Sequence, residues 1–187
     1  MVYGKYIYII SVVAFILFVR LYEYHSLKKI KKQGEIHSCW TLMSLKLCLF
    51  FVLVFCVLEV LLRKEVFIAS CIAGFVLYFI SYFLRRAVRV SLGSYWSWNI
   101  EIREDHRLIR SGPYKFCRHP NYVAVVIEAV GVAFIFNAYW TLIGGLLILV
   151  PLLALRVRLE EHAMVQKFGA EYERYRETTK AFVPGLI

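Results

Sequence analysis

Five long apolar runs divide this chain and set the strongest limit on its fold. They comprise residues Tyr6–Val19, Trp40–Leu62, Val66–Leu84, Asn121–Phe136 and Tyr139–Leu155. A helix needs about 20 apolar residues to cross the hydrocarbon core of a bilayer, and it satisfies its own backbone hydrogen bonds there. The chain is 60% apolar, against about 45–50% for a soluble domain. We therefore predict an all-α, multi-pass membrane helix bundle with about five transmembrane helices.

The first apolar run also fits the core of a secretory signal peptide. The residues that follow it are basic, and no small-residue cleavage site is present. A first membrane helix, extended past Arg20, is therefore the preferred interpretation. None of the five cysteines belongs to a Cys-x-x-Cys pair, so we expect no metal site.

The net charge is +10, and the basic residues lie beside the apolar runs. The densest groups are Lys28–Lys32 and Arg85–Arg89. Because Lys and Arg are enriched in cytoplasmic loops, we expect both groups, the segment 85–120 and the tail after Arg156 to be cytoplasmic. No nucleic-acid recognition module is visible, so the expected partners are membrane lipids and not nucleic acid. No pattern in the sequence predicts an oligomeric state.

Two polar segments interrupt or follow the apolar runs and are the candidate site. The first, 106–122, is basic and contains Pro113 and Pro120; the second, 156–175, follows the last apolar run. We predict that both fold together at the membrane surface into one active site. The expected organisation is three N-terminal transmembrane helices in 1–92, then a catalytic region, 93–187, with two transmembrane helices and a cytoplasmic C-terminal helix.

In the first segment, Pro120 marks the start of the fourth apolar helix. Proline favours the first position of a helix, where backbone N–H groups without partners can hold a carboxylate or phosphate. Arg118 and His119 add donors beside these groups. Two interpretations stay open, because the same two side chains can also anchor the helix at the lipid headgroups.

In the second segment, Arg156 and Glu160 are four residues apart and share a helix face. They can form an ordinary surface pair, but Arg156 follows an unbroken apolar run at the membrane boundary, where a charge is costly and indicates function. Glu160 could bind an ammonium group. Glu128 lies inside the fourth run and either lines a path for the lipid substrate or bonds a neighbouring helix through Ser81 or a tyrosine.

Two motifs occur in order in the C-terminal half. The first is His106-x-Leu108-Ile109-x-Ser111-Gly112-Pro113-Tyr114 followed by Arg118-His119-Pro120-x-Tyr122, and the second is Arg156-x-x-x-Glu160-Glu161 followed by Phe168-Gly169-x-x-Tyr172-x-x-Tyr175. Together they resemble the isoprenylcysteine carboxyl methyltransferase family over the segment 93–184.

The resemblance implies a membrane enzyme that binds S-adenosylmethionine in a cytoplasmic pocket of its C-terminal half, without a Rossmann domain. Glu160 would bind the amino group of the cofactor, and Arg156 would lie at the acceptor as a catalytic and substrate-binding residue. An acceptor hydroxyl would need a base, for which Glu161 or His119 is available; Glu128 is a second substrate-binding candidate. The remaining cofactor contacts implied by the resemblance are His106, Arg107, Leu108, Ile109, Tyr114, His119, Pro120, Asn121 and Tyr122.

The expected function is methyl transfer to a carboxylate or hydroxyl of a lipophilic, long-tailed acceptor at the membrane–cytoplasm interface. Some bacterial relatives methylate hydroxyls of polyketide-derived phenolic lipids or pyrones, which makes that class the first alternative. Three further alternatives are an NADPH-dependent sterol-type reductase, which is similar around 118–122, a phospholipid N-methyltransferase, and a non-catalytic lipid-binding protein.

Overall fold

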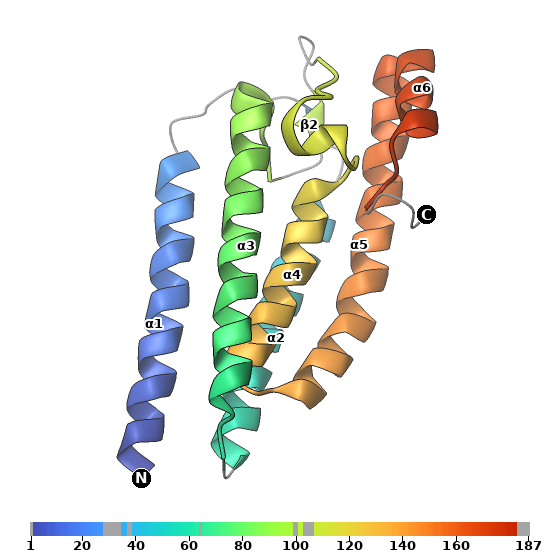
Figure 1. The fold of residues 1–187 in the computed structure, drawn as a ribbon. Helices are drawn as coiled ribbons and strands as arrows, with labels where there is room; N and C mark the ends of the chain where they lie inside the picture. Colours follow the sequence, from blue (N-terminus) through green and yellow to red (C-terminus); the bar gives the residue numbers. More distant parts are fainter. Residues whose placement is uncertain are drawn as a thin grey trace. The chain divides into compact units, whose positions relative to one another are not determined.

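The long elements of the fold are α-helices, and they coincide with the apolar runs (Figure 1). The computed structural model describes residues 2–27, 35–36, 39–63, 65–98, 101–102 and 107–182. Two short strands pair antiparallel, with Glu35 opposite Ile102, and two single turns of 3-10 helix, η1 and η2, lie between α3 and α4. In chain order the elements are α1 Val2–Leu27, β1 Glu35–Ile36, α2 Cys39–Leu62, α3 Ile68–Leu92, η1 Gly93–Tyr95, β2 Glu101–Ile102, η2 Gly112–Lys115, α4 Pro120–Ile135, α5 Tyr139–Phe168 and α6 Ala170–Thr178.

Four of these helices are long and apolar enough to cross a bilayer, and α4 is a shorter apolar helix. The prediction of an all-α, multi-pass bundle is confirmed, and the chain is an integral membrane protein. The 30 residues of α5 extend for roughly 45 Å at 1.5 Å per residue. This length exceeds the roughly 30 Å hydrocarbon core, so the polar end of α5 projects beyond it.

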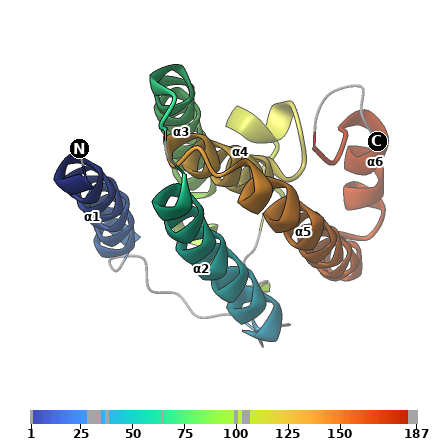
Figure 2. The same cartoon turned by 90° about the horizontal axis from the view of Figure 1, so that it is seen from below.

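The chain forms two compact units, Met1–Lys32 and Gln33–Ile187. The first contains α1, in which Arg20 Nη1 lies 3.1 Å from Glu23 Oε2 one turn along the helix. In the second, α4 contacts α3, α5 and α2, and α2 packs mainly on α5 (Figure 2). The functional division expected between residues 92 and 93 stays a prediction.

The most extensive helix contact, between α3 and α4, depends on glycine and on small polar side chains. A Cβ at Gly74 or at Gly131 would lie within 3.0 Å of backbone atoms of the other helix, so only glycine permits this approach. Ser70 Oγ donates to the carbonyl of Phe134 at 2.9 Å, and Ser81 Oγ donates to that of Ala124 at 2.8 Å. Close packing and interhelical hydrogen bonds of this kind hold helices together in lipid, where apolar surface alone cannot.

The turn between α4 and α5 is held by one polar side chain of its own, Asn137, and by one from α2, Glu59. Asn137 has a positive φ of 54° and accepts a 2.9 Å hydrogen bond from the backbone N–H of Phe67. Glu59 of α2 accepts a 2.8 Å bond from the N–H of Thr141 and another from its hydroxyl. Glu59 therefore satisfies the start of α5, where N–H groups have no helical partner.

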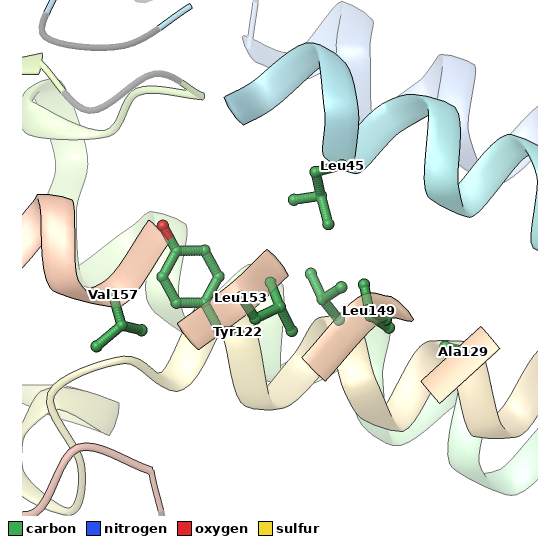
Figure 3. Close-up of a cluster of buried hydrophobic side chains, with 7 residues drawn as sticks. Leu45, Tyr122, Ala129, Leu149, Leu153 and Val157 are labelled. Atoms are coloured by element: carbon green, nitrogen blue, oxygen red, sulfur yellow. The ribbon is translucent and has the colours of Figure 1, made fainter. Parts of the chain in front are cut away.

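An apolar cluster fills the space between α2, α4 and α5 (Figure 3). Tyr122 closes this cluster at its polar end, with its ring among the aliphatic side chains and its hydroxyl bonded to charged groups. The cluster thus fixes the position of the first polar group of the site. Its members are Leu45, Tyr122, Val125, Ala129, Leu149, Leu153 and Val157.

Candidate active site

The site is built around the start of α4, where His119 precedes the helix and Tyr122 lies in its first turn. Pro120 occupies the first helical position, which its missing N–H and fixed φ favour. Its side chain is fully buried. The carbonyl of His119 accepts a 3.1 Å bond from the N–H of Tyr122. The two rings stack with centroids 5.7 Å apart and an interplanar angle of 18°. The helix start therefore presents an imidazole and a phenol side by side.

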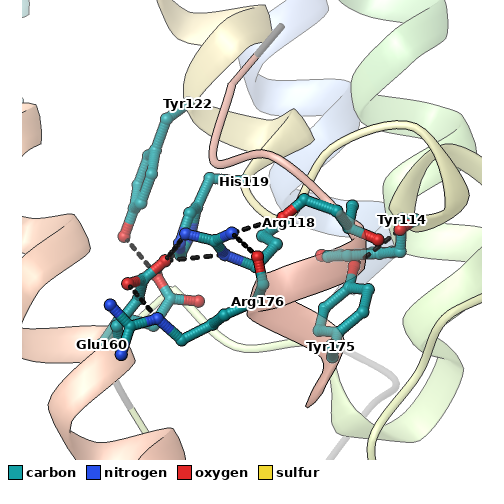
Figure 4. Close-up of polar contacts among 9 residues, drawn as sticks. Tyr114, Arg118, His119, Tyr122, Glu160, Tyr175 and Arg176 are labelled. Atoms are coloured by element: carbon teal, nitrogen blue, oxygen red, sulfur yellow. Dashed lines mark hydrogen bonds and ion pairs between the residues drawn. The ribbon is translucent and has the colours of Figure 1, made fainter. Parts of the chain in front are cut away.

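Glu160 of α5 lies against both rings (Figure 4). The hydroxyl of Tyr122 donates to Glu160 Oε2 at 2.8 Å, and His119 Nδ1 lies 3.7 Å from the same oxygen. The side chain of Glu160 keeps 29% of its surface exposed, so a ligand has access to it. Burial, followed by the negative charge of Glu160, raises the pKa of Tyr114.

Glu161, the next residue of α5, is surrounded by cations. Arg118 Nη2 lies 2.7 Å and His119 Nε2 lies 3.1 Å from Glu161 Oε1, and Arg176 Nε of α6 lies 3.4 Å from Oε2. A carboxylate contacted in this way is strongly favoured in its charged form. In this arrangement Glu161 ties the start of α4 to α5 and α6; its expected catalytic role stays a prediction.

His119 is enclosed by the two carboxylates of α5, one near each ring nitrogen. Burial lowers the pKa of the imidazole, but the hydrogen bonds and charges of Glu160 and Glu161 outweigh burial and raise the pKa to about 9. His119 is therefore protonated at neutral pH, and both of its nitrogens act as donors. An imidazolium cannot accept a proton from a substrate.

Arg156 is buried, with 3% of its surface exposed, and is held from three sides. Its Nε donates to the hydroxyl of Tyr122 at 3.3 Å and its Nη1 to Thr41 Oγ1 at 3.0 Å. Its Nη2 donates to the carbonyl of Trp98 at 3.2 Å. Arg156 and Glu160 thus meet at the Tyr122 hydroxyl, which accepts from the first and donates to the second.

A segment after α6 closes the site over the start of α4. The N–H groups of Arg118 and His119 donate to the carbonyls of Lys180 and Ala181 at 2.9 and 3.0 Å. The guanidinium of Arg118 also donates to the carbonyls of Arg176, at 3.2 Å, and Thr179. Tyr175 donates to the carbonyl of Tyr114 at 2.6 Å. Arg118 therefore binds the C-terminal segment, a contact that neither sequence-based interpretation included, and both interpretations stay predictions.

The structure places the other candidates around this cluster or apart from it. Asn121 follows Pro120 in the first turn of α4. Arg107 is exposed, Leu108 and Ile109 are half-buried, and all three lie in the irregular segment before η2. His106 lies outside the described residues. Within the described residues no hydrogen bond joins segment 107–109 to Glu160, so the cofactor contacts implied there stay predictions.

Glu128 lies apart from the cluster, in a buried ion pair between α4 and α3. Arg85 Nη1 is 2.5 Å from Glu128 Oε2, and the two side chains are 4% and 5% exposed. The expected bond to a neighbouring helix is thus present, with Arg85 of α3 as the partner, whereas Ser81 donates to the carbonyl of Ala124. The substrate-binding role of Glu128 stays a prediction.

Three groups of the site carry no signal in the sequence. Thr41 belongs to an apolar run outside both motifs, the carbonyl of Trp98 is a backbone group, and Arg176 lies among other charged residues of α6. The packing of α2 on α5 brings Thr41 to Arg156, and the packing of α6 on α5 brings Arg176 to Glu161. The Trp98 carbonyl reaches Arg156 from the segment before β2, which also contacts α5.

The sequence matches a described protein family over half of its length. The profile of the isoprenylcysteine carboxyl methyltransferase (ICMT) family matches residues 71–166, which include the Arg118–Tyr122 motif and both carboxylates of α5.

Individual relatives cover parts of the same region. "Uncharacterized protein YpbQ" of Bacillus subtilis is 35% identical over 74 residues, which are 40% of this chain and 44% of that protein. The protein-S-isoprenylcysteine O-methyltransferase of Schizosaccharomyces pombe is 30% identical over 104 residues, 54% of this chain and 44% of the relative. A probable protein-S-isoprenylcysteine O-methyltransferase of Oryza sativa subsp. indica is 30% identical over 123 residues, 65% and 64% of the two chains. The matches thus span about half the length of these relatives.

Proposed function

Because the chain belongs to the isoprenylcysteine carboxyl methyltransferase family, we propose that it transfers a methyl group from S-adenosylmethionine to a lipophilic, long-tailed acceptor. The observation that carries this proposal is the link from Arg156 through the Tyr122 hydroxyl to Glu160. It joins a buried cation to a half-exposed anion at the polar end of an apolar helix cluster. A lipid with a charged headgroup fits such a boundary.

The residues around Glu160 suit the amino-acid part of S-adenosylmethionine, which carries an ammonium and a carboxylate. Glu160 offers an anion, and the His119 imidazolium together with the start of α4 offers positive charge within a few ångströms. Glu160 would hold the ammonium group, while His119, Pro120, Asn121, Tyr122 and Tyr114 would line the pocket. When bound, this cofactor supplies an electrophilic methyl group on a positively charged sulfur.

Arg156 is suited to hold a carboxylate acceptor. A guanidinium has five N–H donors, one on Nε and two on each terminal nitrogen. The hydrogen bonds within the described residues use one donor of each nitrogen. Among the residues that the structure describes, none accepts from the second N–H of Nη1 or of Nη2, and these two donors match the two oxygens of a carboxylate.

The state of the neighbouring groups favours a carboxylate over a hydroxyl acceptor. A carboxylate is ionised at neutral pH and needs no base, whereas a phenol has a pKa near 10. His119 is already protonated, and the carboxylate of Glu161 is bound by Arg118 and Arg176. Neither group is placed to take a proton, so the chain's contribution is to orient the acceptor and exclude water.

The reaction would take place at the cytoplasmic face of the membrane. This orientation follows from the basic residues at Lys28–Lys32 and from Arg86 and Arg89, which the positive-inside rule assigns to the cytoplasm. The acceptor headgroup would reach Arg156 while its tail stays in the bilayer beside α2, α4 and α5.

Calorimetric titration of the detergent-purified protein with S-adenosylhomocysteine, with NADPH as the alternative ligand, tests the proposal. We expect binding of the first alone, weakened about 10- to 100-fold in Glu160→Gln because a charge-assisted contact is lost. Glu171→Gln is the matched control, since Glu171 is an exposed glutamate paired with Arg110. Binding of NADPH alone would support a reductase, and binding of neither by folded protein would support a non-catalytic lipid-binding protein.

The acceptor class is tested by methyl transfer from radiolabelled S-adenosylmethionine to two long-tailed probes. We expect transfer to N-acetyl-S-farnesyl-L-cysteine, which has a carboxylate, and little transfer to a long-chain alkylresorcinol. The reverse preference would contradict the carboxylate assignment and favour the phenolic-lipid alternative.

A further inference from the structure

A threonine of α2 contacts the proposed acceptor-binding arginine. Thr41 lies in the first turns of α2, is fully buried, and accepts a 3.0 Å hydrogen bond from Arg156 Nη1 through its hydroxyl. Thr41 belongs to the N-terminal apolar runs, where no motif indicates a functional residue. Its hydroxyl nevertheless contacts Arg156, the buried cation of the site.

The three hydrogen bonds of Arg156 come from three separate parts of the chain. Tyr122 is in α4, Trp98 follows η1, and Thr41 is in α2, whereas Arg156 itself belongs to α5. An arginine side chain loses about 2 kcal/mol of rotamer entropy when it is fixed, and a planar group is fixed only when it is held at several points. The Thr41 contact holds one terminal nitrogen, while the Trp98 carbonyl holds the other.

We propose that Thr41 is a positioning residue for the Arg156 guanidinium, so that α2 sets the direction in which the remaining N–H groups meet the acceptor. This inference rests on the proposed function, in which Arg156 binds the acceptor. Thr41 does not touch the acceptor and acts through Arg156. Without its hydroxyl, Nη1 loses one partner, and the guanidinium can rotate away from the orientation that binds two oxygens.

A structural role alone predicts a different outcome. If the Thr41 hydroxyl only satisfied a buried donor, its removal would lower stability, because a buried polar group without a partner is costly. It would not change the affinity for one substrate selectively. A positioning role predicts a specific loss of acceptor binding with cofactor binding retained.

The test compares Thr41→Val, which keeps the shape and removes the hydroxyl, with Thr41→Ser, which keeps the hydroxyl. Methyl transfer to N-acetyl-S-farnesyl-L-cysteine is measured with each substrate varied in turn. For Thr41→Val we expect the KM of the acceptor to rise about tenfold, with the KM of S-adenosylmethionine unchanged. Thr41→Ser should stay close to wild type. An unchanged acceptor KM in Thr41→Val, or an equal rise for both substrates, would overturn the proposal.

Thr141→Val is the matched control. The Thr141 hydroxyl also donates within the bundle, at 2.8 Å to Glu59 Oε2, but it lies in the first turn of α5, about four turns away from Arg156. Thr141→Val should lower stability and leave the acceptor KM unchanged. An acceptor KM that rises in both variants would show that loss of stability explains the effect, and would also overturn the proposal.

A double-mutant cycle separates failure of this inference from failure of the proposed function. If the wild-type protein transfers no methyl group, the proposed function fails, but thermal unfolding still tests the contact. We expect Thr41→Val to lower the melting temperature in the wild-type background and to lower it by less in an Arg156→Met background, because the contact with Arg156 is already gone there. An equal decrease in both backgrounds would show that Thr41 and Arg156 are not coupled, and the inference would fail whatever the activity.

Discussion

The buried ion pair between Arg85 and Glu128 predicts a large, partner-dependent effect on stability. Both side chains are about 95% buried, and their closest atoms lie 2.5 Å apart between α3 and α4. Removal of one member of a buried pair takes the closest counter-charge from the other and costs about 3–5 kcal/mol. Replacement of both by apolar side chains of similar size is often neutral or stabilising. We therefore expect Glu128→Leu to lower the free energy of unfolding by about 3–5 kcal/mol, and Arg85→Met/Glu128→Leu to recover most of this loss.

The free energies can be measured by titrating the protein in mixed micelles with a denaturing detergent and following helix content by circular dichroism. Glu171→Gln is the control, because its partner Arg110 is half-exposed and an exposed pair contributes only about 0–1 kcal/mol. If Glu128→Leu costs less than about 1 kcal/mol, or if the double variant is no more stable than the single one, the pair does not act as the structure indicates.

Methyl transfer by the same double variant decides the expected role of Glu128 in substrate binding. If Glu128 serves only to join α4 to α3, the double variant should keep the acceptor KM of the wild type. A raised acceptor KM in a protein of restored stability would instead assign Glu128 to the substrate path.

Two further predictions concern side chains that contact α5, namely His119 near its polar part and Glu59 at its start. His119 has a pKa raised from 6.5 to about 9 by Glu160 and Glu161, so its bound proton stabilises the fold fully below pH 6.5, and this contribution is lost as the pH rises through 9. The melting temperature of the wild type, relative to His119→Gln, should therefore fall between pH 6.5 and 9; a difference that does not vary with pH would contradict the assignment. At the other end, Glu59→Gln weakens the cap on Thr141 and should cost about 1–2 kcal/mol, with the acceptor KM unchanged; calorimetric melts that coincide with wild type would exclude the cap.

Features that depend on neighbouring residues in the chain could be predicted from the sequence. Pro120 starts α4, Gly169 separates α5 from α6 with a φ of 51°, and Asn137 lies in the turn before α5. Each of these residues has a backbone preference that acts locally. The charged residues on the last turns of α5 also pointed to a site, because their position beside an apolar run is costly without a function.

Features that depend on the register between helices could not be predicted. The sequence predicts that Arg85 belongs to a basic cytoplasmic flank. In the structure it lies beside Glu128, because Gly74 and Gly131 allow the backbones of α3 and α4 to pack closely. Thr41 is one polar residue in an apolar run, and only the packing of α2 on α5 gives it a charged partner. Periodicity indicates which face of a helix is buried but not which residue of another helix lies opposite it.

The pairing of residues 118–119 with residues 180–181 has a consequence for the order of events during synthesis. The ribosome must add about 60 residues after the start of α4 before the partner carbonyls exist, which takes roughly 3–12 s at usual elongation rates. During that interval α4 can already be inserted, while Arg118 and His119 lack the segment that later covers them. Membrane insertion and completion of the site are therefore separate steps, and a chain truncated before residue 179 and released from the ribosome should have its helices in place but lack the segment that covers Arg118 and His119.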